Sequence, residues 1–448
     1  MITKSVKRLP AEVGTSGWEA ISKRSLPLRK LECNVNADWL IIGAGFAGLS
    51  AARRLKERRP NDKVVLLEAS ELGKGTAGRN SGFMIDVPHN LSSGDYSSGS
   101  ADATQLEMAQ NRTAIAFAAQ AAAEYRMSRE TFDPSGKINA AATGRGMKLN
   151  MGFGQSLKSA GEQHVFLDAR EMRDITGSDY YLGGLYTPGA VLIQPADYIR
   201  SFAAGLSEKI ELYERSPVTS LKRDGGTWTA VSPHGTVTAP KVIVAVNGHI
   251  EDFGHFRRRL MHIFAYASMT APFDADDLGQ QKSGRDKWAL LPADAMGATV
   301  RKFTSGGKSR IAIRTKYTYE TTITVTDRRM AKMANEHRHS FDARFPGLAG
   351  VPFEYSWAGR LCLSLNHVPA FGEIEEGLYS ACCENGLGTV KSTLAGMMAA
   401  DMAAGSASRQ LEEYMDHAQP SRLPPEPFAW LGINSMIRLQ ELRAGREG

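Results

Sequence analysis

Cysteine is scarce in this 448-residue sequence, and its spacing excludes two common kinds of site. The four cysteines are Cys33, Cys362, Cys382 and Cys383, and no two of them have the C-x-x-C spacing. We therefore expect neither a disulfide framework nor a zinc centre, and we predict no metal site. Sparing use of cysteine suits a reducing compartment, and the predicted location is the cytoplasm.

Long apolar runs are also missing from the sequence. None approaches the roughly 18 residues that a membrane-spanning helix needs, so we expect no membrane span. The N-terminal residues M-I-T-K-S-V-K-R-L-P carry charge, but the apolar segment of a secretory signal does not follow them.

Neither sign of charge dominates the sequence. Lysine and arginine total 54 against 48 aspartates and glutamates, and the resulting net charge of +6 is spread along the chain. This dispersion is typical of a solvated surface and predicts no nucleic-acid-binding face, although an acidic substrate or partner stays open. The hydrophobic content of 42% is that of a globular protein, and 448 residues favour two domains over one core.

The segment 37–68 carries the most specific pattern in the sequence. Trp39–Ile42 is a short apolar run typical of a buried parallel strand, and Gly43, Gly45 and Gly48 follow it in the G-x-G-x-x-G spacing. The first glycine permits a tight turn, the second lets the backbone approach a pyrophosphate, and the third lets a helix pack close to the sheet.

The residues after these glycines complete a strand–helix–strand unit. Residues 49–59 predict a helix whose N-terminus faces the phosphates, and Val64–Leu67 predicts a second buried strand. Glu68 ends this strand at a position where an acidic side chain can accept hydrogen bonds from a ribose diol. An ordinary glycine-rich turn would not account for Glu68, so the segment predicts dinucleotide binding. The pattern by itself does not separate FAD from NAD.

Further motifs follow in order, and together with 37–68 they indicate a family. They are G-T-A-G-R-N-S-G at Gly75–Gly82, V-I-V-A-V-N-G-H at Val242–His249, W-A-G-R-L-C at Trp357–Cys362, P-A-F-G at Pro369–Gly372 and N-G-L-G-T-V-K-S-T-L-A-G from Asn385. The set resembles the FAD-dependent amine and D-amino-acid oxidase superfamily. Within it, the chain is similar to the branch of gamma-glutamylputrescine oxidase, glycine oxidase and sarcosine oxidase, over residues 37 to about 405.

The resemblance implies an α/β fold with a Rossmann-type FAD-binding domain that is discontinuous in sequence. It also implies an α+β substrate domain built on a mostly antiparallel sheet, which the alternating pattern of Met261–Thr270 supports. The expected segments are an N-terminal lead-in at 1–36, the FAD-binding domain at 37–90, 160–250 and 355–405, the substrate domain at 91–159 and 251–354, and a C-terminal helical tail at 406–448.

FAD is the cofactor that the resemblance implies. The residues expected to contact it are Gly43, Gly45, Phe46, Ala47, Gly48, Glu68, Ala69, Gly78, Arg79, Asn80, Ser81, Gly82, Val218, Asn247, Gly248, Arg360, Gly386, Leu387, Gly388 and Thr389. Cys362 falls near the position where some sarcosine oxidases attach flavin through a thioether. Because a buried free cysteine commonly acts as a small hydrophobe, we expect non-covalent binding.

The implied reaction oxidises the C–N bond of a small-molecule amine. Hydride passes to flavin N5, the imine hydrolyses, and oxygen as acceptor gives hydrogen peroxide. Such chemistry needs positioning more than a strict general base. The candidate catalytic residues are Tyr266 and His262 on one face of the strand Met261–Thr270, and Lys391, which lies one residue from a substrate-binding lysine of sarcosine oxidases. A structural or solvated role remains an alternative for His262 and Lys391.

The substrate is less well determined than the cofactor. Gly82 stands where sarcosine oxidases have an arginine for the substrate carboxylate, which favours longer amines such as gamma-glutamylputrescine. Arg301, Arg314 and Lys316 could bind a carboxylate, although surface exposure is the expectation for most of them. The alternatives are a dehydrogenase for pipecolate, N-methyl or opine-type substrates that passes electrons to a carrier, and a flavin subunit of a larger complex. A homo-oligomer also stays open.

Overall fold

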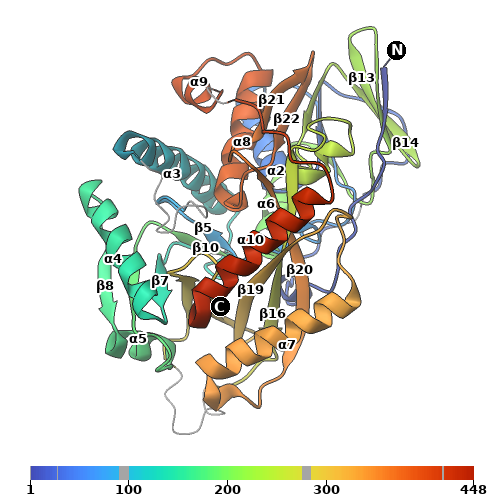
Figure 1. The fold of residues 1–448 in the computed structure, drawn as a ribbon. Helices are drawn as coiled ribbons and strands as arrows, with labels where there is room; N and C mark the ends of the chain where they lie inside the picture. The colour runs from blue at the N-terminus through green and yellow to red at the C-terminus, as the bar shows by residue number, and fades with distance from the viewer. Residues whose placement is uncertain (1, 28, 90–99, 275–283, 416–417) are drawn as a thin grey trace.

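A six-stranded sheet forms the centre of one half of the molecule (Figure 1). The computed structural model describes residues 2–27, 29–89, 100–274, 284–415 and 418–448. The strand order is β11 (Glu211–Tyr213), β4 (Val64–Leu67), β3 (Trp39–Ile42), β15 (Lys241–Val244), β22 (Leu378–Cys382) and β21 (Ala370–Glu375). All neighbouring strands are parallel except β21 and β22, as expected for a Rossmann-type sheet buried on both faces.

Helices cover one face of this sheet. They are α2 (Phe46–Arg58), α3 (Ala101–Glu124), α6 (Pro195–Leu206), α8 (Gly388–Ala403) and α9 (Arg409–Met415). Ile41, Leu66 and Ile243 point into the core that these helices share. Helices α2 and α8 are in backbone contact, because a Cβ on Gly396 would lie 2.0 Å from the carbonyl oxygen of Ala47.

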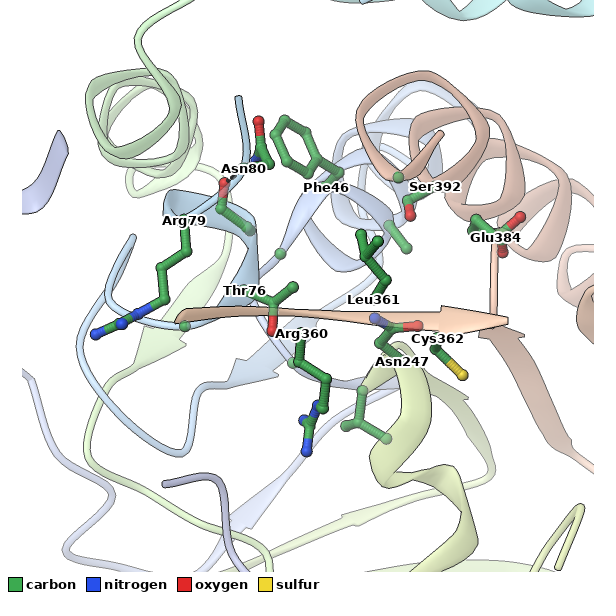
Figure 2. Close-up of a pocket in the computed structure, with 18 of the residues that line it drawn as sticks. Phe46, Thr76, Arg79, Asn80, Asn247, Arg360, Leu361, Cys362, Glu384 and Ser392 are labelled. Atoms are coloured by element: carbon green, nitrogen blue, oxygen red, sulfur yellow. Dashed lines mark hydrogen bonds between the residues drawn. The ribbon is translucent and has the colours of Figure 1, made fainter. Parts of the chain in front are cut away.

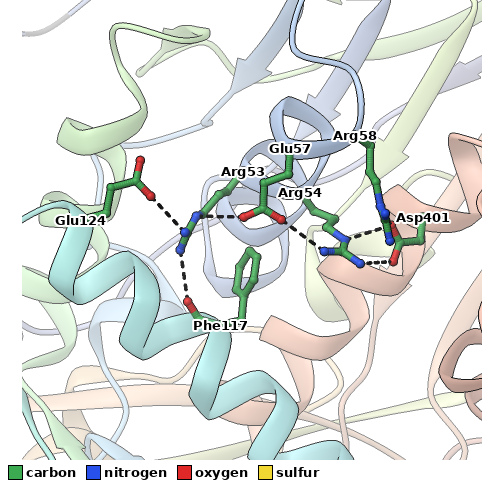
Figure 3. Close-up of polar contacts among 7 residues, drawn as sticks. All are labelled: Arg53, Arg54, Glu57, Arg58, Phe117, Glu124 and Asp401. Atoms are coloured by element: carbon green, nitrogen blue, oxygen red, sulfur yellow. Dashed lines mark hydrogen bonds and ion pairs between the residues drawn. The ribbon is translucent and has the colours of Figure 1, made fainter.

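Charged side chains also link α2 to α3 and to α8 (Figure 3). Asp401 of α8 is buried and accepts hydrogen bonds from Arg54 at 2.9 and 2.8 Å and from Arg58 at 2.9 Å, both on α2. Arg53 of α2 reaches α3, where it donates to the carbonyl oxygen of Phe117 and to Glu124. These contacts fix α2 relative to α3 and α8.

A five-stranded sheet covers the opposite face. Its order is β1 (Ile2–Ser5), β12 (Ser220–Asp224), β13 (Thr227–Ser232), β14 (Gly235–Ala239) and β2 (Val35–Asn36). Trp228 and Val237 of this sheet pack against Leu40 and Val65 of the six-stranded sheet. The predicted lead-in is therefore structured, since it supplies β1, β2 and the short helix α1 (Gly17–Ala20).

The other half is built on an eight-stranded sheet. Its order is β20 (Phe353–Ser364), β16 (Leu260–Thr270), β19 (Lys308–Tyr319), β18 (Thr299–Ser305), β17 (Trp288–Pro292), β7 (Lys137–Ala141), β9 (Gly183–Thr187) and β8 (Val165–Asp168). Only β17 and β7 pair in parallel, so the prediction of a mostly antiparallel sheet is confirmed.

Helices and a small sheet complete this half. The elements are α4 (Gly144–Ser159), α5 (Ala169–Thr176), α7 (Asp327–Arg344), α10 (Phe428–Ala444) and the three-stranded sheet of β5 (Phe83–Met84), β10 (Val191–Ile193) and β6 (Phe132–Asp133). Helices α4 and α5 lie over β7, β8 and β9, whereas α7 lies over β16, β19 and β20. Within the described residues, no helix is long and apolar enough to cross a membrane, and no metal-binding cluster of His, Cys, Asp or Glu is present.

Strand pairing divides the chain differently from the expected boundaries. Strands β8, β9 and β20 belong to the eight-stranded sheet, although 160–250 and the segment from 355 were expected in the FAD-binding domain. Helix α3 lies in the expected substrate segment 91–159 but packs on the helices of the six-stranded sheet. Local periodicity predicts a strand or a helix, whereas long-range pairing decides which sheet it joins.

Candidate functional site

A long cavity runs from the six-stranded sheet to the β20 edge of the eight-stranded sheet (Figure 2). The predicted cofactor residues found in its lining are Gly43, Gly45, Phe46, Ala47, Glu68, Ala69, Arg79, Asn80, Ser81, Gly82, Val218, Asn247, Arg360, Gly386, Leu387, Gly388 and Thr389. Gly48, Gly78 and Gly248 lie outside the lining, at places of close packing. A Cβ at these positions would lie 1.8 Å from the Gly43 oxygen, 1.7 Å from the Gly73 oxygen and 2.8 Å from the His262 ring.

The turn between β3 and α2 is shaped for close approach by a ligand. Gly43 has φ of 101°, and a Cβ there would lie 2.5 Å from the carbonyl oxygen of Ala245. Gly45 is the N-cap of α2, and no side chain caps this end of the helix. The free backbone N–H groups at the start of α2, and the positive end of its helix dipole, therefore point toward the cavity and suit a phosphate group.

Glu68 lies at the carboxyl end of β4, beside this turn. Its carboxylate accepts hydrogen bonds from the backbone N–H groups of Ala44 and Ser70, both at 2.9 Å. Burial raises the pKa of Glu68, while these two amide bonds act in the opposite direction. Val218 lines the same end of the cavity, so the adenosine end of a dinucleotide fits here.

The glycine loop Gly75–Gly82 is fixed by its own arginine. Arg79 is buried, and its guanidinium donates to the carbonyl oxygens of Lys74, Val13 and Gly14 at 2.8, 2.9 and 2.8 Å. Figure 2 shows this side chain pointing away from the cavity, so Arg79 lines the cavity with its backbone. The predicted approach of Arg79 to the flavin therefore concerns the loop backbone, not the guanidinium.

Asn80 keeps the loop in shape at the cavity wall. Its Nδ2 donates to the carbonyl oxygen of Ala77 at 2.7 Å, and its Oδ1 accepts from the N–H of Gly82 at 2.8 Å.

A second arginine under the loop was expected at the surface and is buried instead. Arg301 on β18 donates to the carbonyl oxygens of Ile193 at 2.6 Å and Gly82 at 3.3 Å. A Cβ on Gly82 would lie 2.3 Å from this guanidinium. Burial lowers the pKa of Arg301 to about 10, which leaves it charged at neutral pH. Arg301 therefore supports the loop through its bonds to these carbonyl oxygens.

The N-terminal segment supplies cavity residues that the sequence pattern did not reveal. Arg8, Leu9, Pro10 and Glu12 line the cavity. Glu12 pairs with Arg79 at 3.3 Å, and burial raises the pKa of this carboxyl. No local signal marks these residues, because they reach the cavity only through the pairing of β1 with the five-stranded sheet.

The turn before α8 forms another part of the cavity wall. Asn385 and Gly386 have φ of 50° and 95°, and α8 then begins at Gly388 with no side-chain cap. This second uncapped helix end directs N–H groups and a positive dipole end toward the cavity. Thr389 anchors it by donating its hydroxyl to the carbonyl oxygen of Phe83.

Glu384 is a buried carboxyl in this same turn. Its Oε2 accepts a hydrogen bond from the hydroxyl of Tyr414 at 3.0 Å, and its Oε1 is buried without a hydrogen-bond partner among the described residues. Burial raises the pKa of Glu384 to about 8, because the charged form is poorly solvated there. Glu384 was not among the predicted site residues. Its position just before a glycine-rich turn is the sequence signal that could have indicated a role in the site.

Arg360 on β20 offers the cavity a buried donor that is unpaired within the described part of the chain. It lines the cavity and is 8% exposed, and its Nε is buried with no hydrogen-bond partner among the described residues. A buried N–H group without a partner is costly, so this position suits an anionic or hydrogen-bond-accepting ligand.

The sequence of this chain is similar to those of several known proteins. The family described as FAD dependent oxidoreductase, DAO, matches residues 38–402. The chain belongs to this family. A probable oxidoreductase, OrdL, of Haemophilus influenzae is 27% identical, with 86% of each chain covered. The gamma-glutamylputrescine oxidoreductase of Escherichia coli K12 is 25% identical, with 88% of this chain and 90% of the relative covered.

Solved structures show the same fold. Glycine oxidase from Geobacillus kaustophilus has a TM-score of 0.70 at 19% identity, over 88% of this chain and 100% of that one. L-proline dehydrogenase from P. horikoshii has a TM-score of 0.65 at 16% identity, over 85% and 97% of the two chains. At these identities the likeness concerns the fold alone, which confirms the predicted fold class.

The cavity of this DAO-family protein fits FAD. The turn after β3 and the start of α2 suit the pyrophosphate, and Glu68 suits the ribose. Arg360 and the uncapped start of α8 offer donors to the remaining acceptors of the cofactor. Cys362 lies in the lining and is buried in a strand, as expected for a small core residue.

The three candidate catalytic residues are not in the cavity lining. Tyr266 is fully buried and hydrogen-bonds Thr318 at 2.6 Å, beside α7. His262 hydrogen-bonds Glu251 at 2.8 Å, and Lys391 pairs with Glu107 at 3.1 Å.

The other face of β16 lines the cavity, through Ala265 and Ala267. Both faces of β16 are buried, so the alternation of its side chains did not reveal which of them meets the cavity. Tyr266 and His262, which were expected to face the substrate, lie on the other face of β16 from the two alanines that line the cavity.

Arg314 of β19 and His89 lie together in one part of the cavity lining. Arg314 lines the cavity, donates to the hydroxyl of Thr299 at 2.6 Å and stacks on Tyr317 with its guanidinium carbon 5.2 Å from the ring centroid. His89 lines the same region, and burial together with the charges of Lys137, Arg314 and Lys391 holds its pKa well below the ordinary value.

Proposed function

We propose that this protein uses FAD to oxidise the C–N bond of a small amine or amino-acid derivative that also carries a carboxylate. The observation that carries the proposal is the position of Arg314 in the cavity lining. Arg314 is held in place by Thr299 and by the ring of Tyr317, which orients its planar guanidinium for a carboxylate. Bound FAD supplies the two-electron acceptor for the oxidation.

The charges of the cavity also suit the reacting end of such a substrate. Positive groups around His89 disfavour an ammonium ion nearby, and so favour the neutral amine with its available lone pair. The start of α8 favours negative charge at the part of the wall toward which its N–H groups are directed. These two features position the substrate and stabilise developing charge without a general base.

Gamma-glutamylputrescine is our best candidate within this class. It combines an amine with a carboxylate, and it is the compound in the name of the Escherichia coli relative. Putrescine has the same amine end but lacks the glutamyl group, so the pair measures the contribution of that group, its carboxylate included.

The test is an anaerobic titration of the FAD-loaded protein, followed by its visible spectrum. The panel is gamma-glutamylputrescine, putrescine, sarcosine, pipecolate and D-amino acids. We expect a carboxylate-bearing amine to bleach the spectrum at much lower concentration than putrescine. Equal responses to gamma-glutamylputrescine and putrescine would contradict the proposal that the substrate carries a carboxylate. A bound flavin that no member of the panel bleaches would contradict the proposal that the substrate is an amine.

Arg314→Met tests the assigned residue. Loss of a charge-assisted hydrogen bond is worth about 1.5–3 kcal/mol, so the half-bleaching concentration of the carboxylate substrate should rise by about one to two orders of magnitude. The response to putrescine should change little. Arg129→Met, at a side chain that is 74% exposed, is the matched control. Peroxide yield in air then distinguishes oxygen from another carrier as acceptor.

A further inference from the structure

Helix α10 is apolar on two opposite sides. Its inner side packs Ala429, Ile433 and Ile437 against Met261 and Tyr319 of the eight-stranded sheet. Its outer side, called here the outer stripe, consists of Phe428 (68% exposed), Leu431 (52%), Met436 (52%), Leu439 (49%) and Leu442 (64%). Figure 1 shows α10 as the red helix lying across the surface of this half.

The outer stripe is continuous along the helix. Its members are separated by three, five, three and three residues, which keeps them on one side of an α-helix. The helix has 17 residues, so the stripe extends for about 25 Å. A soluble surface rarely presents aligned large apolar side chains without a binding partner.

Arginines border the outer stripe at both ends. Arg438 and Arg443 are exposed on the C-terminal half of α10. Exposed Arg258 and Arg422 lie beside its N-terminal end, where the N–H of Leu423 donates to the carbonyl oxygen of Arg258 at 2.7 Å.

The two glutamates of this region are held by the protein. Glu426 accepts from the hydroxyl of Tyr319 and the N–H of Trp430, both at 3.0 Å. Glu441 has a side chain that is 8% exposed, accepts from the N–H of Tyr317 and lies 3.5 Å from Arg438. The outward charge around the stripe is therefore mainly positive.

We propose that α10 docks this protein on the surface of an anionic phospholipid bilayer. The outer stripe lies in the headgroup region, and the bordering arginines contact lipid phosphates. A second copy of the chain fits less well, because a stable protein interface takes about 20–30 residues on each side and the stripe offers one helix side. An antiparallel pair of α10 helices would also bring arginines of the two copies together.

The test is sedimentation of the full FAD-loaded chain with vesicles. One set is phosphatidylcholine alone, and the other contains added phosphatidylglycerol. We expect the wild type to sediment with the anionic vesicles and more weakly with the neutral ones. The double variant Leu431→Ser/Leu439→Ser should bind both about tenfold or more weakly. Arg438→Gln/Arg443→Gln should bind the anionic vesicles about tenfold more weakly and the neutral ones unchanged.

Leu182→Ser is the matched control, because Leu182 is 47% exposed and lies outside α10. Retained flavin absorbance reports that each variant is folded.

Three results would overturn the proposal. The first is a wild type that stays in the supernatant with both vesicle types. The second is an equal loss of binding in Leu182→Ser. The third is light scattering that shows a dimer dissociated by Leu431→Ser/Leu439→Ser, which would make the stripe an interface between copies.

Discussion

Replacing Arg360 by methionine should weaken FAD binding without destabilising the apoprotein. Arg360 is 8% exposed and its Nε has no hydrogen-bond partner among the described residues. Burial lowers the pKa of Arg360, while the charges of Glu12 and Asp252 act in the opposite direction. The apoprotein therefore carries a desolvation cost that acceptor groups of FAD would offset.

The magnitude follows from the type of bond. A hydrogen bond to a charged group contributes about 1.5–3 kcal/mol, so Arg360→Met should raise the Kd of FAD about 10- to 150-fold. Methionine keeps the apolar stem without the buried charge, so the melting temperature of the apoprotein should stay the same or rise.

Arg79→Met is the matched control, because Arg79 is also a buried arginine of the cavity. Its guanidinium donates to three backbone carbonyl oxygens in the loop and the N-terminal segment. Leaving these buried acceptors unpaired should lower apoprotein stability by about 3 kcal/mol or more. Titration of FAD by fluorescence quenching gives the Kd, and thermal unfolding of the apoprotein gives the stability. A lower melting temperature with unchanged FAD affinity in Arg360→Met would refute the reasoning, since Arg360 would then be a structural residue.

The remaining predictions concern helix packing and pH. Asp401→Ala should lower the free energy of unfolding in urea by about 2–3 kcal/mol, because a buried carboxylate is lost while the 22% exposed Arg54 can still reach water; a change below about 0.5 kcal/mol would contradict this. Gly396→Val should lower the melting temperature and weaken FAD binding, because its side chain would meet the backbone of Ala47 and displace α2; unchanged values for both would exclude the contact. Burial raises the pKa of Glu384 from 4.5 to about 8, so the folded state keeps a proton that the unfolded state releases, and apoprotein stability should fall as pH rises through this interval and level off above it. Glu384→Gln should flatten this dependence in urea midpoints measured against pH, and an unchanged slope would assign it to other groups.

The sequence alone determined the part of the site that is local in the chain. The strand Trp39–Ile42 and the tight turn at Gly43 are present where the pattern predicted them, and the helix predicted over 49–59 begins three residues earlier, at Phe46. Each depends on interactions within about 30 residues: apolar periodicity, a φ that only glycine adopts readily, and a helix end that needs no cap. Glu68 follows from the same unit, because it ends the next strand of one βαβ segment.

Contacts between distant segments decided the rest. Glu12 reaches the cavity because β1 pairs with β12, more than 200 residues away. Arg79 and Arg360 are both arginines in predicted cofactor motifs. Arg79 donates to carbonyl oxygens of the N-terminal segment, whereas the Nε of Arg360 has no hydrogen-bond partner among the described residues.

Strand β16 shows why such assignments need the tertiary structure. It is buried on both faces, so alternation could not say whether Tyr266 or Ala265 meets the cavity. Its neighbours β19 and β20 and the covering helix α7 decide this, because they place one face against the helix and leave the other to the cavity. Local sequence determines which residues can occupy a buried strand, and only long-range packing determines what each face of that strand touches.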